Sequence, residues 1–158
     1  MIDSYLFLKL IHILSAVVMT GTAGGIAFSL YIARRSNNIQ AIAVTARNVV
    51  IADWLFTAPA IVVVLISGLL LMKLSNYSFT SLWFTSVMGL FGFITVSWLP
   101  VVYVQYKLRA LADQCVEAEE LIDEFKKLFR WWIALGIPGF IAVLDMFWLM
   151  VFKPFAMD

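Results

Sequence analysis

The sequence predicts an all-α fold, a bundle of four transmembrane helices that run up, down, up and down. Hydrophobic residues make up 63% of the 158 residues and charged residues only 13%, whereas an ordinary soluble domain is about half apolar and about a quarter charged. The hydrophobic residues form four runs, each reaching the roughly 20 residues that a helix needs to cross a bilayer. Little chain remains outside these runs, so we expect residues 1–158 to form a single integral membrane domain.

The first predicted span covers about residues 5–33 and ends at Arg34 and Arg35. Its apolar run is longer than that of a cleaved signal peptide, so we expect it to stay in the protein. A polar stretch over residues 34–48 separates it from the second span, which covers about residues 49–72.

The third predicted span covers about residues 82–106 and the fourth about residues 131–152. Apolar side chains recur at helical spacing between these spans, so we expect both helices to extend out of the membrane as amphipathic stems. Acidic residues of the same segment are expected in the first turns of the fourth helix, where the helix dipole favours anions. The apolar residues are Leu108, Leu111, Cys115, Ile122, Phe125 and Phe129, and the acidic ones are Glu117, Glu119, Glu120, Asp123 and Glu124.

Helices two to four each contain a proline at a similar depth, namely Pro59, Pro100 and Pro138. Each predicts a kink, because proline removes a hydrogen bond inside a helix. Gly24 and Gly25 lie at about the same level of the first helix. These positions are either ordinary packing kinks or the walls of a cytoplasm-facing cavity for a ligand.

The positive charges predict the orientation of the bundle. Eight of the 11 Lys and Arg residues lie in residues 34–47 and 107–130. We therefore expect these segments in the cytoplasm and both termini outside. The net charge of +1 argues against a nucleic-acid partner. A single cysteine, Cys115, excludes a disulfide within the chain and a metal site that uses two cysteines.

Four ionisable side chains lie within the apolar runs, namely Lys9, His12, Asp53 and Asp145. A charge near the bilayer centre costs about 2.5 to 3.5 kcal/mol, so each should face the bundle and find a partner. The first and fourth helices of such a bundle are expected to be neighbours. We therefore expect Asp145 to approach His12 or, one turn further out, Lys9.

His12 is the only histidine, which excludes two histidine ligands to one haem within a single chain. Two interpretations of His12 stay open: a polar residue hydrogen-bonded in the bundle, or an axial ligand of haem iron. In the second case Asp145 is expected to bond the other ring nitrogen.

Asp53 on the second helix is expected to face Gln105 or Arg109 on the third, as a structural clamp or as part of a proton relay. Gly21 and Gly25 form a G-x-x-x-G pattern that allows close helix contact, either within the chain, in a homodimer or in a larger membrane complex. Membrane lipid is expected around the bundle.

Four segments together resemble an uncharacterised bacterial family of predicted integral membrane proteins, the domain-of-unknown-function family twenty-two sixty-nine. They are residues 5–15 (YLFLKLIHILS), 53–59 (DWLFTAP), 98–105 (WLPVVYVQ) and 149–154 (LMVFKP). The resemblance spans nearly the whole chain. It implies a four-helix protein of the bacterial inner (cytoplasmic) membrane and implies no particular activity.

The pattern Tyr5-Leu-x-x-Lys9-x-x-His12, followed by an apolar helix, is also similar to the first helix of HemJ-type protoporphyrinogen oxidases. Those membrane proteins bind haem b through a histidine in that helix. The likeness covers about the first thirty residues and implies that His12 is the axial ligand of a haem b.

Two functions therefore compete. The first is an accessory or assembly protein of the inner membrane with no specific activity assigned, and the second is a haem-binding membrane redox protein that uses His12. Whether the protein is an enzyme stays open. A transporter is a third option, and four helices without an inverted repeat would need to oligomerise for it.

Overall fold

The computed structural model describes residues 3–154, and this part of the chain contains helices and no strands. Four long helical segments are each long and apolar enough to cross a membrane. They are α1 (Ser4–Arg35), a continuous segment of α2 (Ile39–Ala52), η1 (Asp53–Thr57) and α3 (Ala58–Leu74), then α4 (Leu82–Ala118) and α5 (Asp123–Phe152). The predicted all-α class with four spans is confirmed.

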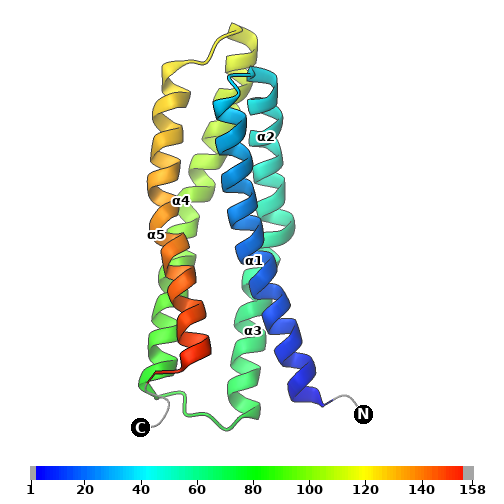
Figure 1. Ribbon diagram of the computed structural model, residues 1–158, viewed down its shortest axis with the longest axis vertical. Coiled ribbons are helices and arrows are strands. Elements are labelled where there is room, and N and C mark those ends of the chain that lie inside the picture. The colour runs from blue at the N-terminus through cyan, green and yellow to red at the C-terminus, as the bar shows by residue number, and fades with distance from the viewer. Residues whose placement is uncertain (1–2, 155–158) are drawn as a thin grey trace.

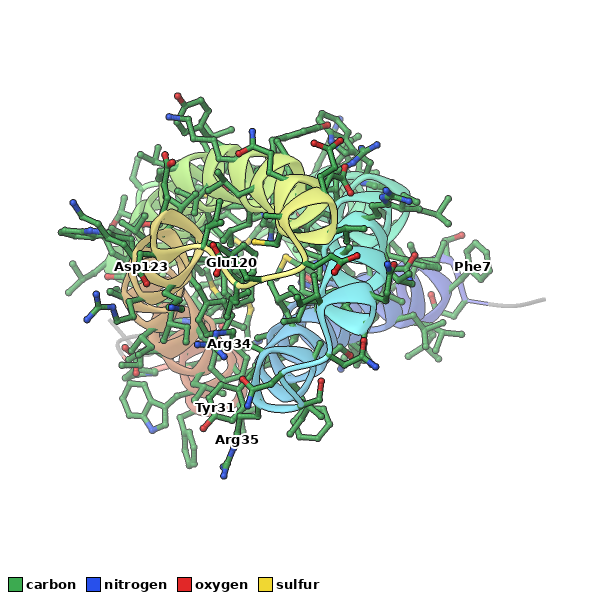
Figure 2. All side chains as sticks on the ribbon, turned by 90° about the horizontal axis from the view of Figure 1, so that it is seen from above. Phe7, Tyr31, Arg34, Arg35, Glu120 and Asp123 are labelled. Carbon is green, nitrogen blue, oxygen red and sulfur yellow. The ribbon has the colours of Figure 1, made fainter. Side chains whose placement is uncertain are left out.

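The long segments run side by side and are joined at alternating ends (Figure 1). We call one end the charged end. It holds the α1–α2 and α4–α5 connections, and its charged side chains include Arg34, Arg35, Glu120 and Asp123 (Figure 2). The α3–α4 connection lies at the opposite end, together with the first turn of α1 and the last turn of α5 (Figure 1).

Side chains at the helix starts explain where these helices begin. The carboxylate of Asp3 accepts a hydrogen bond from the backbone N–H of Tyr5, and Asn38 and Ser81 cap α2 and α4 in the same way. Such caps satisfy N–H groups that have no partner inside the helix. Because Asn38 caps α2, the second helix starts ten residues before residue 49, where the predicted apolar span begins, so most of the polar stretch over residues 34–48 is helical.

A π-helical turn interrupts the second segment at Asp53–Thr57 and ends two residues before Pro59. The backbone N–H of Ala58 bonds to the carbonyl of Asp53, five residues back, as in a π turn. Pro59 has no N–H to donate, so a register change at this point relieves its conflict with the preceding turn. Pro100 and Pro138 lie inside α4 and α5, where the expected kinks stay predictions.

The expected stems of the third and fourth helices exist. α4 continues to Ala118 and α5 starts at Asp123, and apolar residues of both form a buried cluster with α1 and α2 at the charged end. The predicted positions of the acidic residues are wrong in part. Glu119 adopts a left-handed conformation that ends α4, so only Asp123 and Glu124 lie in the first turn of α5.

The bundle is not a closed ring. α1 packs along α2, η1 and α3, while α4 packs along α5 and α2, and α1 and α5 make few contacts. One point where they meet is Gly24, whose Cβ position lies 3.9 Å from the Phe140 ring. The expectation that the first and last helices are close neighbours is therefore wrong for most of their length.

Candidate functional site: a cavity at the π turn

A cavity of about 570 Å³ lies between α1, η1, α4 and α5. Most of its wall is apolar, and Asp53 is its only charged residue among those the structure describes. The cavity includes the region where α1 and α5 fail to pack together. Several of its wall residues are also exposed on the outside of the bundle, among them Phe28, Ile137 and Ile141.

Four polar side chains meet in this wall, and we call them the polar cluster: Asp53 and Thr57 of η1, and Trp98 and Gln105 of α4. Asp53, Thr57 and Gln105 are each only 2% exposed. The other three side chains surround the Asp53 carboxyl. All three are within hydrogen-bonding reach of that carboxyl, but Asp53 Oδ2, Thr57 Oγ1, Trp98 Nε1 and Gln105 Oε1 make no hydrogen bond of good geometry. Such groups are expensive to bury unpaired.

A fifth unpaired group lies in the wall that α5 contributes. Trp132 lines the cavity, is 5% exposed, and its Nε1 has no partner. Sequence reasoning missed Trp132, because a tryptophan at the edge of an apolar run is also typical of the membrane interface. Thr57 and Trp98, in contrast, share helix faces with Asp53 and Gln105 by simple spacing.

The structure brings Asp53 and Gln105 together, as expected, but not Asp53 and Arg109. Arg109 is exposed, and the ion pairs within residues 3–154 are Arg47–Asp113 and Asp123–Lys126. The reason is that Arg109 lies one helical turn beyond Gln105, in the α4 stem. The predicted Asp53–Arg109 alternative is therefore wrong.

His12 is half-buried on α1 and faces α3. Its Nδ1 lies 2.9 Å from Ser67 Oγ, and a Cβ added at Gly68 would lie 3.2 Å from its Cε1. The Ser67 hydroxyl donates to the Val63 carbonyl. With its proton directed to Val63, the hydroxyl can only accept from His12, so this arrangement fits the tautomer with the proton on Nδ1 and the lone pair on Nε2. His12 does not line the cavity.

The structure does not bring Asp145 to His12 or Lys9, so that expectation is wrong. Asp145 lies in a shallower hollow between α4 and α5, with Ser86 and Gly89. Lys9 is exposed on α1, 5.8 Å from the centre of the Tyr5 ring. The reason is that the bundle is open. α1 packs against α3, whereas Asp145 of α5 lies beside α4, so the two helices do not bring these side chains together.

Gly21 and Gly25 face no other part of the described chain, since no atom lies within 4 Å of a Cβ placed at either position. The prediction of a close helix contact through this pair inside the chain is therefore wrong, and a homodimer through it stays a prediction.

Comparison with known proteins agrees with this architecture. No curated protein and no solved structure gives a significant match to the chain. The family model described as "Predicted integral membrane protein (DUF2269)" matches residues 6–154. With four helices able to span a membrane, the chain is a multi-pass integral membrane protein, and it belongs to this DUF2269 family.

Proposed function

We propose that this protein is an accessory protein of the bacterial inner membrane that works by binding a lipid-like molecule inside its helix bundle. The cavity between α1, η1, α4 and α5 carries this proposal. Its volume of about 570 Å³ lies within the range of roughly 300 to 1,000 Å³ that is usual for small-molecule sites. Its mostly apolar wall suits an apolar ligand.

The route of access supports a ligand that comes from the membrane. The cavity wall reaches the outside of the bundle at Phe28, Ile137 and Ile141, which are 68%, 52% and 53% exposed. These residues lie inside the apolar spans, where the outside of the bundle is expected to contact lipid. A molecule dissolved in the bilayer would therefore enter sideways between α1 and α5.

Filling the cavity tests the proposal. Gly136 lines the cavity and has open space at its Cβ, so Gly136→Leu should occupy part of the ligand volume. Gly92 also has open space at its Cβ but lies outside both cavities, so Gly92→Leu is the matched control. Both variants would be purified in detergent, and the bound lipids extracted and quantified by mass spectrometry.

We expect a lipid-like molecule to copurify at about one per chain with the unaltered protein and with Gly92→Leu. Gly136→Leu should lose most of it, because a leucine side chain would overlap the ligand. Equal amounts of every lipid species in the two variants would contradict the binding proposal.

A second candidate is haem b binding at His12, favoured by the Ser67 contact that leaves Nε2 free to ligate iron. It predicts a Soret band in the purified protein that shifts with dithionite and disappears in His12→Ala. Size-exclusion chromatography would verify that this variant stays folded. A colourless, monodisperse protein from haem-replete cells would contradict the haem proposal and leave the lipid-binding one in place.

A further inference from the structure

We propose that the polar cluster binds the head group of an uncharged amphiphile, and that this head group carries ring carbonyl or hydroxyl oxygens, as in a membrane quinone or quinol. The inference rests on the proposed ligand-binding function and adds the class of the ligand. Three observations and one physical argument support it: the depth of the polar cluster, the charge of the cavity, the unpaired donors, and the small gain when an alkyl tail moves from lipid into the cavity.

The polar cluster lies at the depth where the head group of an amphiphile would be. Within the polar cluster, Gln105 lies one residue and Asp53 four residues inside the charged-end limits of their predicted spans, whereas Thr57 and Trp98 each lie eight residues inside. The cavity continues to Ile94 and Val143, each 12 residues inside these limits. At 1.5 Å per residue this is about 18 Å, past the middle of a bilayer core about 30 Å thick. The apolar end of the cavity thus lies deeper in the membrane than any residue of the polar cluster.

The charge of the cavity selects against anionic lipids. No Lys, Arg or His of the described chain lines it, and Asp53 is its one acidic residue. A phosphate head group would find no cation there and would be repelled by an ionised Asp53. Phospholipids are therefore unsuitable ligands at this position.

The unpaired donors also select against a cationic amphiphile. Trp98 and Trp132 both have buried Nε1 atoms without partners, and an indole N–H can only donate. An ammonium group could donate to Asp53 Oδ2 or Gln105 Oε1, but it carries no acceptor and would leave both indoles without a partner. A ring oxygen can accept from an indole, whereas a ring hydroxyl can donate to Asp53 Oδ2 or Gln105 Oε1. A quinone or quinol provides these groups on an apolar ring.

The head group must decide the selectivity, because the tail cannot. Moving an alkyl tail from lipid into an apolar cavity exchanges one apolar surrounding for another and gains little. Hydrogen bonds to buried groups that otherwise lack partners are gained only by a ligand with suitable oxygens. Removing these protein groups should therefore weaken the binding of a quinone and leave the binding of a plain alkyl ligand unchanged.

The experiment uses the full chain in detergent with the exposed Trp54, Trp131 and Trp148 replaced by Phe. Fluorescence of the remaining tryptophans, which include Trp98 and Trp132, reports binding. Two quenching probes with the same tail length are titrated: decylubiquinone, which carries ring oxygens, and 1-bromodecane, which carries none. The head-group variant is Thr57→Val combined with Gln105→Leu. Its matched control is Ser67→Ala, which removes a buried hydroxyl outside the cavity.

We expect the head-group variant to weaken decylubiquinone binding on the order of tenfold, because the ring carbonyls lose the Thr57 hydroxyl and the Gln105 amide N–H as hydrogen-bond donors, and to leave 1-bromodecane binding unchanged. Ser67→Ala should change the affinity for neither probe. Thermal unfolding establishes that each variant is folded. Should the double variant not fold, Thr57→Val and Thr57→Ser are compared instead, and only the hydroxyl-retaining Ser should bind decylubiquinone normally.

Two contrary results are distinguishable. Unchanged decylubiquinone binding in the head-group variant, with both probes weakened by Gly136→Leu, would overturn the head-group inference and retain the cavity as an apolar site. Equal binding of both probes to Gly136→Leu and Gly92→Leu would overturn the proposed function itself, and the inference with it.

Discussion

At the residue scale, Gly68 and His12 form the closest contact between α1 and α3 that involves a glycine. A Cβ at Gly68 would lie 3.2 Å from Cε1 and 3.6 Å from Nδ1 of the imidazole, tighter than ordinary van der Waals contact. The missing side chain thus makes room for the ring beside Ser67. His12 therefore lies in an apolar run and still finds a polar partner inside its own chain.

Gly68→Ala should therefore destabilise the protein relative to Gly92→Ala. Both changes improve helix propensity by up to about 1 kcal/mol, but only Gly68→Ala forces the His12 ring to move, at a cost of about 1 to 3 kcal/mol. Thermal unfolding in detergent measures the difference. Adding His12→Ala should cancel it, because the ring is then absent. Equal stability of the two alanine variants would show that His12 does not pack on Gly68.

Sequence spacing predicted only part of the polar cluster. Asp53 and Gln105 were expected to meet, because each lies on the polar face of its own helix. The proposed meeting of Asp145 with His12 failed, because it depended on α1 and α5 closing a ring. Helix periodicity defines the faces of one helix, whereas the choice of partner for each face depends on packing across the whole bundle.

At the element scale, the second helix shows a different limit. Gln40, Thr45 and Arg47 made residues 34–48 resemble a loop, yet Ile42, Ala46 and Val49 are buried along one face of α2. Four polar side chains among the 14 residues of α2, Gln40, Thr45, Arg47 and Asn48, interrupt its apolar residues and hide the start of the helix from a search for an unbroken apolar run. The π turn at Asp53–Thr57 was also not predicted, since a single proline indicates a kink and not the register change that relieves it.

The packing of the stems yields a second prediction. Phe125 is fully buried at the start of α5, stacked on Phe129 with ring centres 6.3 Å apart. Phe125→Ala should cost about 3 to 5 kcal/mol, because it leaves a cavity in a packed core. Phe152→Ala, at a residue 67% exposed on the same helix, is the control and should cost much less. Thermal unfolding of both variants measures this.

If the two phenylalanine variants lose the same stability, the stems do not form a packed core at the charged end. The exposed Arg47–Asp113 pair, 2.7 Å apart between α2 and α4, would not compensate for this loss. A solvent-exposed ion pair contributes only about 0 to 1 kcal/mol. Apolar packing, and not charge pairing, should therefore hold the stems together.

At the scale of the whole molecule, orientation in the membrane follows from the distribution of charge between the two ends. The charged end receives eight of the 11 Lys and Arg residues, and the opposite end has Lys9, Lys73 and Lys153. Because positively charged loops stay in the cytoplasm, the polar cluster would lie toward the cytoplasmic leaflet. A ligand head group bound there would be close to the inner membrane surface.

This orientation predicts the labelling of two single cysteines with a membrane-impermeant maleimide. Gln40→Cys at the charged end should react only after the inner membrane is opened, and Thr80→Cys at the opposite end should react in intact spheroplasts. Both positions are exposed, and the native Cys115 is fully buried and should stay unlabelled. Labelling of Gln40→Cys but not Thr80→Cys in intact spheroplasts would show that the bundle has the opposite orientation. The head-group site would then lie toward the outer leaflet.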